Sequence, residues 1–257
     1  MFKTTVIECR DLYKSYEIDG KKLEVIRGVN LEVKSGEYVI IFGPSGCGKT
    51  TFLNLIAGLE PPDSGEILIR GRKLRHHEDD ELARYHRRKI GIIFQNYNLI
   101  PTLSVWENIA LPQLAAGISL ESRRERAFEL LEMFGLAKLA NDIPTELSGG
   151  EQQRVALCRA MVNNPWIFLA DEPTGNLDKK NAEIVMNIIY DLNRHSHRTV
   201  ILVTHNENHL HFAHRVIYMK NGQFVREERR RPEKSPPRRA KDIPDEALEK
   251  LKQEAEI

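Results

Sequence analysis

The glycine-rich segment GPSGCGKT, Gly43–Thr50, is the feature that most constrains the fold of this chain. It directly follows the apolar run Tyr38–Phe42, whose composition is typical of a strand buried on both faces. Beyond it, apolar residues recur at helical spacing until Gly58, and Pro61 and Pro62 cannot continue a helix. The apolar stripe comprises Phe52, Leu55, Ile56 and Leu59. Strand, glycine loop and helix in this order predict a phosphate-binding loop in a parallel α/β core.

The glycines of this loop allow successive backbone N–H groups to surround a phosphate, and the helix that follows adds its positive dipole end. Lys49 is expected to reach the β- and γ-phosphate oxygens, and Thr50 to offer its hydroxyl to Mg²⁺. Cys47 could act as a redox brake on nucleotide binding, but the sequence favours a small space-filling residue. The expected nucleotide contacts of the loop are Gly43, Pro44, Ser45, Gly46, Cys47, Gly48, Lys49, Thr50 and Thr51.

Two carboxylates end a second apolar run, Ile167–Ala170. A strand here would deliver Asp171 and Glu172 beside the glycine loop in a doubly wound sheet. We expect Asp171 to hold Mg²⁺ through a water and Glu172 to polarise the attacking water. The alternative is an acidic pair that only caps the next turn, and the presence of the glycine loop argues against it.

Two further polar residues follow apolar runs in the same way. His205 follows Thr199–Thr204 and could contact a γ-phosphate, although a histidine at a strand end is often structural. Gln95 follows Ile90–Phe94, and its amide could reach both Mg²⁺ and the attacking water. A role for Gln95 at the site is predicted only because the glycine loop and the other polar residues are present in the same chain.

The segment LSGGEQQR, Leu147–Arg154, predicts a helix that begins after the N-cap Ser148. Gly149 and Gly150 are costly in a helix, but they permit close approach of an anion to its first turn. Residues Val155, Cys158 and Val162 would form the buried face behind it. An ordinary capped helix is the alternative.

The remaining pattern predicts the domain organisation. The first 35 residues alternate in polarity, which indicates antiparallel strands with turns at Asp19-Gly20 and Ser35-Gly36. Residues 96–165 are mainly helical in pattern, with an apolar stripe that ends near Gly135. The stripe comprises Ala127, Leu130, Leu131 and Phe134. Strand and helix patterns then alternate again, so the fold class is α/β, with an N-terminal antiparallel β subdomain and an inserted α-helical subdomain.

A change of composition follows at the C-terminal end. Residues 226–241 contain eight Lys or Arg, three Glu and three Pro, which predicts an extended basic linker after a domain of residues 1–225. Residues 242–257 could form a short amphipathic helix or a solvated tail. We prefer the solvated tail to a contact with a partner or a lipid surface.

Composition limits the remaining function classes. A net charge of +1 in 257 residues gives no general argument for binding nucleic acid or an anionic membrane. The apolar runs are strand-sized, and the first residues lack a signal-peptide core. The three cysteines, Cys9, Cys47 and Cys158, are unclustered and fit reduced thiols. We therefore expect a soluble cytosolic protein.

In combination, these motifs resemble the nucleotide-binding subunit of an ATP-binding cassette (ABC) transporter over roughly residues 4–225. The resemblance implies an ATPase with MgATP as its ligand and a second copy as its partner. Ser148, Gly149 and Gly150 would act across the interface on ATP held by the other copy, and Asp178 would connect the two sites. Tyr16 matches the aromatic residue that stacks on adenine. The corresponding family motifs are Walker A (43–50), the Q-loop (Gln95), the signature (147–154), Walker B (167–172), the D-loop (176–178) and the switch histidine (His205).

A narrower resemblance rests on DEPTGNLD, 171–178, together with FQNYNLIPTLSVWEN, 94–108. These segments are similar to the branch for lipoprotein release, macrolide export and antimicrobial-peptide resistance, and cell-division ATPases are close neighbours. The resemblance implies a separate integral membrane permease, bound through residues 96–108, and a peripheral position on the cytoplasmic face of the membrane. The tail beyond Gln223 departs from most such subunits.

Three alternatives remain at this stage. A soluble ABC protein acting on nucleic acid or ribosomes would usually carry a long coiled-coil insertion or a second cassette, and neither is visible, so no nucleic-acid partner is expected. A P-loop kinase would not need the LSGGEQQR segment. A zinc site is conceivable because four histidines gather in one stretch, but no cysteine or additional acidic ligand joins them. These are His205, His209, His211 and His214.

Overall fold

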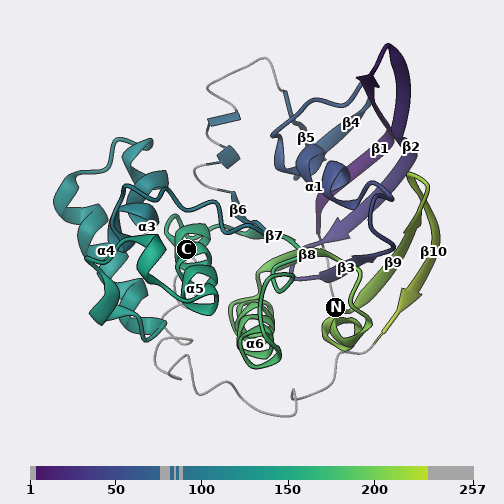
Figure 1. Cartoon of the computed structure of the whole chain (residues 1–257). Coiled ribbons are helices and arrows are strands. Elements are labelled where there is room, and N and C mark those ends of the chain that lie inside the picture. The colour runs from purple at the N-terminus through teal and green to yellow at the C-terminus, as the bar shows by residue number, and fades with distance from the viewer. Residues whose placement is uncertain (1–3, 76–81, 84, 87–88, 231–257) are drawn as a thin grey trace. The chain divides into compact units, whose positions relative to one another are not determined.

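The computed structural model describes residues 4–75, 82–83, 85–86 and 89–230 (Figure 1). The chain divides into two compact units. Described residues up to Tyr85 and from Thr199 onward belong to the first unit, and His86–Arg198 form the second.

The first unit contains an antiparallel sheet of four strands in the order β2-β1-β4-β5. The long hairpin of β1 and β2 turns at Asp19 and Gly20, which both have positive φ, the conformation that tight hairpin turns require. Buried and exposed residues alternate in β2 from Val29 to Val33, whereas β1 has register shifts and does not alternate regularly. The antiparallel pairing of the two strands confirms the N-terminal strands predicted from the sequence. The strands are β1 (Thr5–Ile18), β2 (Lys21–Lys34), β4 (Ser64–Ile69) and β5 (Arg72–Lys73).

The same unit contains the predicted buried strand β3 (Tyr38–Phe42). It pairs in parallel with β8 (Thr199–Thr204) on one side and with β9 (Arg215–Lys220) on the other. A short 3₁₀ segment, Glu207–Phe212, connects β8 to β9. The side chains of β3 and β8 are almost entirely buried, as their continuous apolar composition predicts.

Helix α1 (Lys49–Ala57) follows the glycine loop and ends at Gly58, whose φ of 71° is the left-handed conformation of a helix C-cap. Phe52, Leu55 and Ile56 are buried as predicted, but Leu59 is not part of the stripe. Its backbone N–H closes the cap by donating to the Asn54 carbonyl, so its side chain lies beyond the helix and is 46% exposed.

In the second unit, β6 (Ile90–Ile93) pairs in parallel with β7 (Ile167–Asp171). Helices α3, α4 and α5 pack against one another, and α5 also contacts α6 (Figure 1). The predicted apolar stripe of α4 is buried, and the helix ends one residue before Phe134. The helices are α3 (Val105–Leu114), α4 (Leu120–Met133), α5 (Gly149–Met161) and α6 (Lys179–Ser196), with 3₁₀ turns at Ala137–Leu139 and Pro144–Glu146.

Residues 96–104 were expected to belong to the helical region, but they form turns. Asn108 of α3 explains their shape, because its fully buried amide bonds to the backbone of the turn. The amide nitrogen donates to the carbonyls of Ile100, Leu103 and Ser104, each at 3.0 Å. A polar side chain within the apolar pattern therefore organises the segment that precedes α3.

The predicted linker begins too early in the sequence. Residues 226–229 belong to β10 (Gln223–Arg229), which pairs antiparallel with β9, and residues 231–257 lie outside the described part of the chain. The charged residues of β10 have partners on β9: the Arg226 guanidinium lies 5.1 Å from the centre of the Tyr218 ring, and the Tyr218 hydroxyl donates to Glu228 at 3.2 Å. An edge strand rich in charged residues therefore has a sequence that is easily taken for a charged linker.

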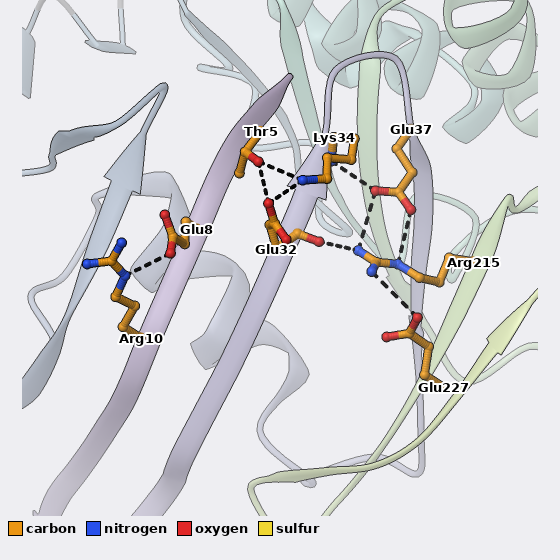
Figure 2. Close-up of polar contacts among 8 residues, drawn as sticks. All are labelled: Thr5, Glu8, Arg10, Glu32, Lys34, Glu37, Arg215 and Glu227. Atoms are coloured by element: carbon orange, nitrogen blue, oxygen red, sulfur yellow. Dashed lines mark hydrogen bonds and ion pairs between the residues drawn. The ribbon is translucent and has the colours of Figure 1, made fainter. Parts of the chain in front are cut away.

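Arg215 of β9 connects these strands to β2 and to the turn that precedes β3, as Figure 2 shows. Its Nε lies 3.1 Å from the Glu37 carboxylate, and both side chains are buried. The Arg215 guanidinium also donates to the Glu32 carbonyl and lies 3.6 Å from the Glu227 carboxylate of β10. A buried ion pair is costly unless all its partners are present, so β10 contributes to the stability of this unit.

Truncation after Val225 should therefore lower the melting temperature by at least about 5 °C, because it removes the Glu227 partner of Arg215 and most of the β9–β10 ladder. Truncation after Arg230 retains the strand and is the control, so its melting temperature is the reference for the loss. Thermal denaturation followed by circular dichroism compares the two. Equal melting temperatures for both truncations would contradict a structural role for β10.

Candidate functional site

The glycine loop leaves β3 beside β8. Gly43 extends their pairing, since its N–H donates to the Thr204 carbonyl at 3.3 Å. A Cβ at Gly43 would lie 2.3 Å from the Met219 carbonyl oxygen, and one at Gly48 would lie 2.8 Å from the Val25 carbonyl oxygen. Glycine is thus required at both positions by the protein's own backbone, in addition to any ligand. Gly46 also has a positive φ, but a Cβ there would meet no atom within 4 Å.

Lys49 lies over this loop. Its Nζ donates to the carbonyls of Gly43 and Pro44, each at 2.9 Å, and the residue is 5% exposed. Among the described residues, no side chain caps the N-terminus of α1, where Gly48 is the N-cap. A cation and a helix N-terminus that meet at one loop form a set of donors suited to an anion such as phosphate.

Tyr16 lies next to the same helix. Its hydroxyl donates to the Glu60 carboxylate at 2.6 Å and also interacts with Thr51 in the first turn of α1. Burial and then the Glu60 hydrogen bond raise the pKa of Tyr16 to about 12. Tyr13 is instead 44% exposed, and its hydroxyl lies against Gly28. Tyr16 therefore contacts Thr51 of the predicted loop, whereas the hydroxyl of the neighbouring Tyr13 lies against Gly28.

His205 directly follows β8. The parallel register pairs Phe42 with Thr204, so the backbones of Gly43 and His205 leave the sheet at the same edge. The histidine is exposed there. The first unit therefore brings together four of the predicted features: the glycine loop, Lys49, Tyr16 and His205.

The second unit brings the predicted carboxylates and Gln95 to one edge of the β6–β7 pair. The register pairs Ile93 with Ala170, so Gln95 and Glu172 follow the strands at equivalent positions. Asp171 is the last residue of β7. Glu172 adopts a φ of 41°, the left-handed region that is unfavourable for a residue with a Cβ. Nothing in the sequence indicated this conformation.

The turn after Glu172 contacts the residues that follow β6. Asn176 donates through Nδ2 to the Gln95 carbonyl and to the Asn96 side-chain oxygen, both at 3.2 Å. A Cβ at Gly175 would lie 2.8 Å from the Gln95 amide nitrogen. Sequence reasoning did not identify Asn176 as a contact of Gln95, because the two residues are 81 positions apart.

Helix α5 begins at Gly149 with Ser148 as its N-cap, as predicted. The backbone N–H and hydroxyl of Ser148 both donate to the Glu151 carboxylate, at 2.8 and 2.6 Å. These hydrogen bonds lower the pKa of Glu151. The predicted face of Val155, Cys158 and Val162 is buried.

Gly150 packs against α6. A Cβ there would lie 2.3 Å from the Asn181 side-chain oxygen. Asn181 is held in place by Asp178, whose carboxylate accepts from the Asn181 backbone N–H at 2.8 Å and from its Nδ2 at 2.9 Å. The same hydrogen bonds lower the pKa of Asp178. Asp178, the N-cap of α6, thus fixes the side chain that requires glycine in α5.

Gly150→Ala should therefore lower the free energy of unfolding by about 1–3 kcal/mol, because the added methyl group displaces Asn181. In an Asn181→Ala background the same substitution should cost much less, since the space is then open. Urea denaturation of the two single variants and the double variant measures this coupling. Equal costs of Gly150→Ala in both backgrounds would contradict the proposed contact.

The other sequence expectations concern metals and membranes. Among residues 4–75, 82–83, 85–86 and 89–230, no group of three or more His, Cys, Asp or Glu side chains could hold a metal ion, and this range includes the four clustered histidines. No helix within the described part of the chain has the length and apolar character of a membrane-spanning segment.

Comparisons with known proteins extend these observations. The family model described as ABC transporter matches residues 26–175. An uncharacterized ABC transporter ATP-binding protein of Methanocaldococcus jannaschii, MJ0796, is 45% identical over 230 residues, which cover 88% of this chain and 98% of the relative. The macrolide export ATP-binding/permease protein MacB of Wolinella succinogenes is 41% identical over 86% of this chain and 34% of its own length.

A solved structure is similar over 88% of the chain. The dimeric post-hydrolysis state of MJ0796 bound to ADP and Pi superposes with a TM-score of 0.81 at 44% identity, and it covers 88% of this chain and 99% of that chain. The residues matched by the family model include the glycine loop, the acidic strand end and the helix that begins at Gly149.

Proposed function

The chain belongs to the ABC transporter ATP-binding family. We propose that it drives a separate membrane permease of the lipoprotein-release or macrolide-export type by ATP-dependent dimerisation. The chain is an ABC-type ATPase that binds and hydrolyses ATP. The observation that carries the proposal is the presence in one chain of both a lysine-bearing phosphate loop and a helix that opens with two glycines. Gly150 also makes room for Asn181 within the chain, and in the proposed dimer the same glycine-opened helix start offers free backbone N–H groups to ATP held by the other copy.

Each predicted residue has a role in this proposal. Lys49 and the backbone of Gly43–Thr51 hold the phosphates, and Tyr16 stacks on the adenine. Glu172 polarises the attacking water, and His205 contacts the γ-phosphate. The exposed position of His205 at the sheet edge shared with Gly43 supports this role, because it leaves the imidazole accessible beside the loop that would hold the phosphates.

Mg²⁺ fits the donors that are present. Thr50, Gln95 and Asp171 offer a hydroxyl, an amide oxygen and a carboxylate, the hard oxygen ligands that Mg²⁺ prefers. When bound, the ion would neutralise charge on the phosphate oxygens. The chain's own residues orient the water and the phosphates.

Dimerisation completes the site in this proposal. Ser148, Gly149 and Gly150 of one copy face the phosphate loop of the other across ATP, and Asp178 lies at the boundary of the two sites. Support comes from MJ0796, whose solved structure with ADP and Pi is described as dimeric. Loss of the γ-phosphate would separate the copies, and this converts hydrolysis into motion.

The permease is proposed from the family branch. MacB is named as a combined ATP-binding and permease protein, and this chain matches about a third of it. We place the permease contact at residues 96–108, where Asn108 holds the turns that precede α3. The chain would then lie on the cytoplasmic face of the membrane.

Affinity capture from detergent-solubilised membranes of the source organism tests this proposal. The bait is Glu172→Gln with MgATP, and Lys49→Ala is the matched control. An integral membrane protein with a large extracytoplasmic domain, enriched only with the first bait, is the expected result. Enrichment of ribosomal proteins or nucleic-acid enzymes would instead contradict the permease assignment.

A further inference from the structure

The loop that follows Gln95 has an unusual backbone. Tyr97 and Asn98 are consecutive residues with φ values of 57° and 50°. Both carry a Cβ, so both are in the left-handed region at a steric cost. Such a conformation persists only when surrounding contacts determine it.

Arg159 of α5 supplies these contacts. One terminal nitrogen of its guanidinium donates to the Tyr97 carbonyl at 2.6 Å, and the other donates to the Asn98 carbonyl. Burial lowers the pKa of Arg159 to about 10, which leaves the group cationic near neutral pH. The planar fork of arginine can serve two adjacent carbonyl groups at once, whereas lysine offers a single point charge.

The loop is held from a second side as well. Asn176 donates to the Gln95 carbonyl and to the Asn96 side-chain oxygen. The side-chain nitrogen of Gln95 lies so close to Gly175 that a Cβ there would be 2.8 Å from it. Tyr97 also extends to the start of α5, where its hydroxyl lies 3.0 Å from the position of a Cβ on Gly149. Residues 95–98 therefore lie between the turn after Glu172 and the helix that carries the signature.

We infer that Arg159 is a positioning residue for hydrolysis, which acts by fixing the loop that carries Gln95. The inference rests on the proposed role of Gln95 with Mg²⁺ and the attacking water. Arg159 does not touch nucleotide in this account. By bonding to the carbonyls of Tyr97 and Asn98, it fixes the path of the backbone after Gln95. Because Arg159 belongs to α5, it also attaches this loop to the helix that begins at Gly149. Displacing a catalytic group by a fraction of an ångström lowers kcat more than substrate affinity.

The test is steady-state ATP hydrolysis by the full-length protein. Arg159→Met should lower kcat about tenfold or more while KM for MgATP stays within about twofold. The kcat of Arg159→Lys should lie between those of Arg159→Met and the wild type, because lysine keeps the positive charge but cannot bond well to both carbonyls at once. Cys158→Ala is the matched control: it opens a cavity at a fully buried position of the same helix and should keep the wild-type kcat.

Gln95→Ala separates a positioning role from a purely structural one. If Arg159 acts through Gln95, the double variant Gln95→Ala/Arg159→Met should be no slower than Gln95→Ala alone. Multiplicative losses in the double variant would overturn the inference, as would a kcat within about twofold of wild type for Arg159→Met. Should Arg159→Met fail to fold, Arg159→Lys carries the same test in the wild-type and Gln95→Ala backgrounds, since lysine cannot serve both carbonyls.

The Gln95→Ala variant also separates this inference from the proposed function. A slow Gln95→Ala beside a normal Arg159→Met would refute only the positioning role of Arg159. Wild-type turnover of Gln95→Ala would refute the proposed role of Gln95, and the inference about Arg159 with it.

Discussion

Glu172→Gln is expected to lower kcat for ATP hydrolysis by roughly 10²- to 10⁴-fold, the contribution typical of a positioned general base. The substitution keeps the size of the side chain and removes its charge. It also leaves the strained backbone unchanged, because Glu and Gln are equally disfavoured at a φ of 41°. The variant should therefore fold normally and bind ATP with near wild-type affinity.

Phosphate release at saturating MgATP measures this loss, and fluorescent-nucleotide titration measures the affinity. Glu183→Gln is the matched control, since Glu183 is an exposed carboxylate of α6 in the same unit. It should turn over at the wild-type rate. Near-normal hydrolysis by Glu172→Gln would refute the role proposed for this carboxylate.

Lys49→Ala should weaken ATP binding at least about tenfold, because a hydrogen bond to a charged group contributes about 1.5–3 kcal/mol and each 1.4 kcal/mol is a factor of ten. Lys49 is the buried cation that lies over the loop, bonded to the carbonyls of Gly43 and Pro44. In the proposed complex it turns from these carbonyls to the phosphates. Its removal leaves the phosphate loop without its cationic side chain.

Isothermal titration with MgATP measures the affinity, and thermal denaturation without nucleotide shows whether the variant is folded. Lys73→Ala is the matched control, because Lys73 is an exposed lysine of the same unit that pairs with Glu66. It should bind ATP as the wild type does. Tight MgATP binding by folded Lys49→Ala would overturn the assignment of the phosphate loop.

The core elements could be predicted from the sequence because their signals are local. The apolar runs of β3, β7 and β8, the stripe of α4 and the N-cap of α5 are each contained within a few neighbouring residues. The strand at Gln223–Arg229 was missed for the opposite reason. Its contacts with the rest of the unit lie on another strand: Glu227 pairs with Arg215, and Arg226 and Glu228 contact Tyr218.

In the candidate site, too, the local motifs could be predicted from the sequence and the long-range contacts could not. Its chemical residues lie in short motifs, whereas the residues that support them are distant in sequence. Asn181 lies against Gly150, Asn176 bonds to the residues after β6, and Arg159 bonds to the carbonyls of Tyr97 and Asn98. Single-residue identity cannot reveal such contacts, because asparagine and arginine are ordinary surface residues unless the fold brings them to a partner.

ATP is proposed to join two copies of this chain, and size-exclusion chromatography with light scattering measures the mass of the resulting particle. The measured mass of Glu172→Gln should be twice the monomer mass of 29.6 kDa in the presence of MgATP and should equal the monomer mass without it. Lys49→Ala should remain monomeric under both conditions. A Glu172→Gln protein that binds MgATP and stays at the monomer mass, or that is dimeric regardless of nucleotide, would contradict the account.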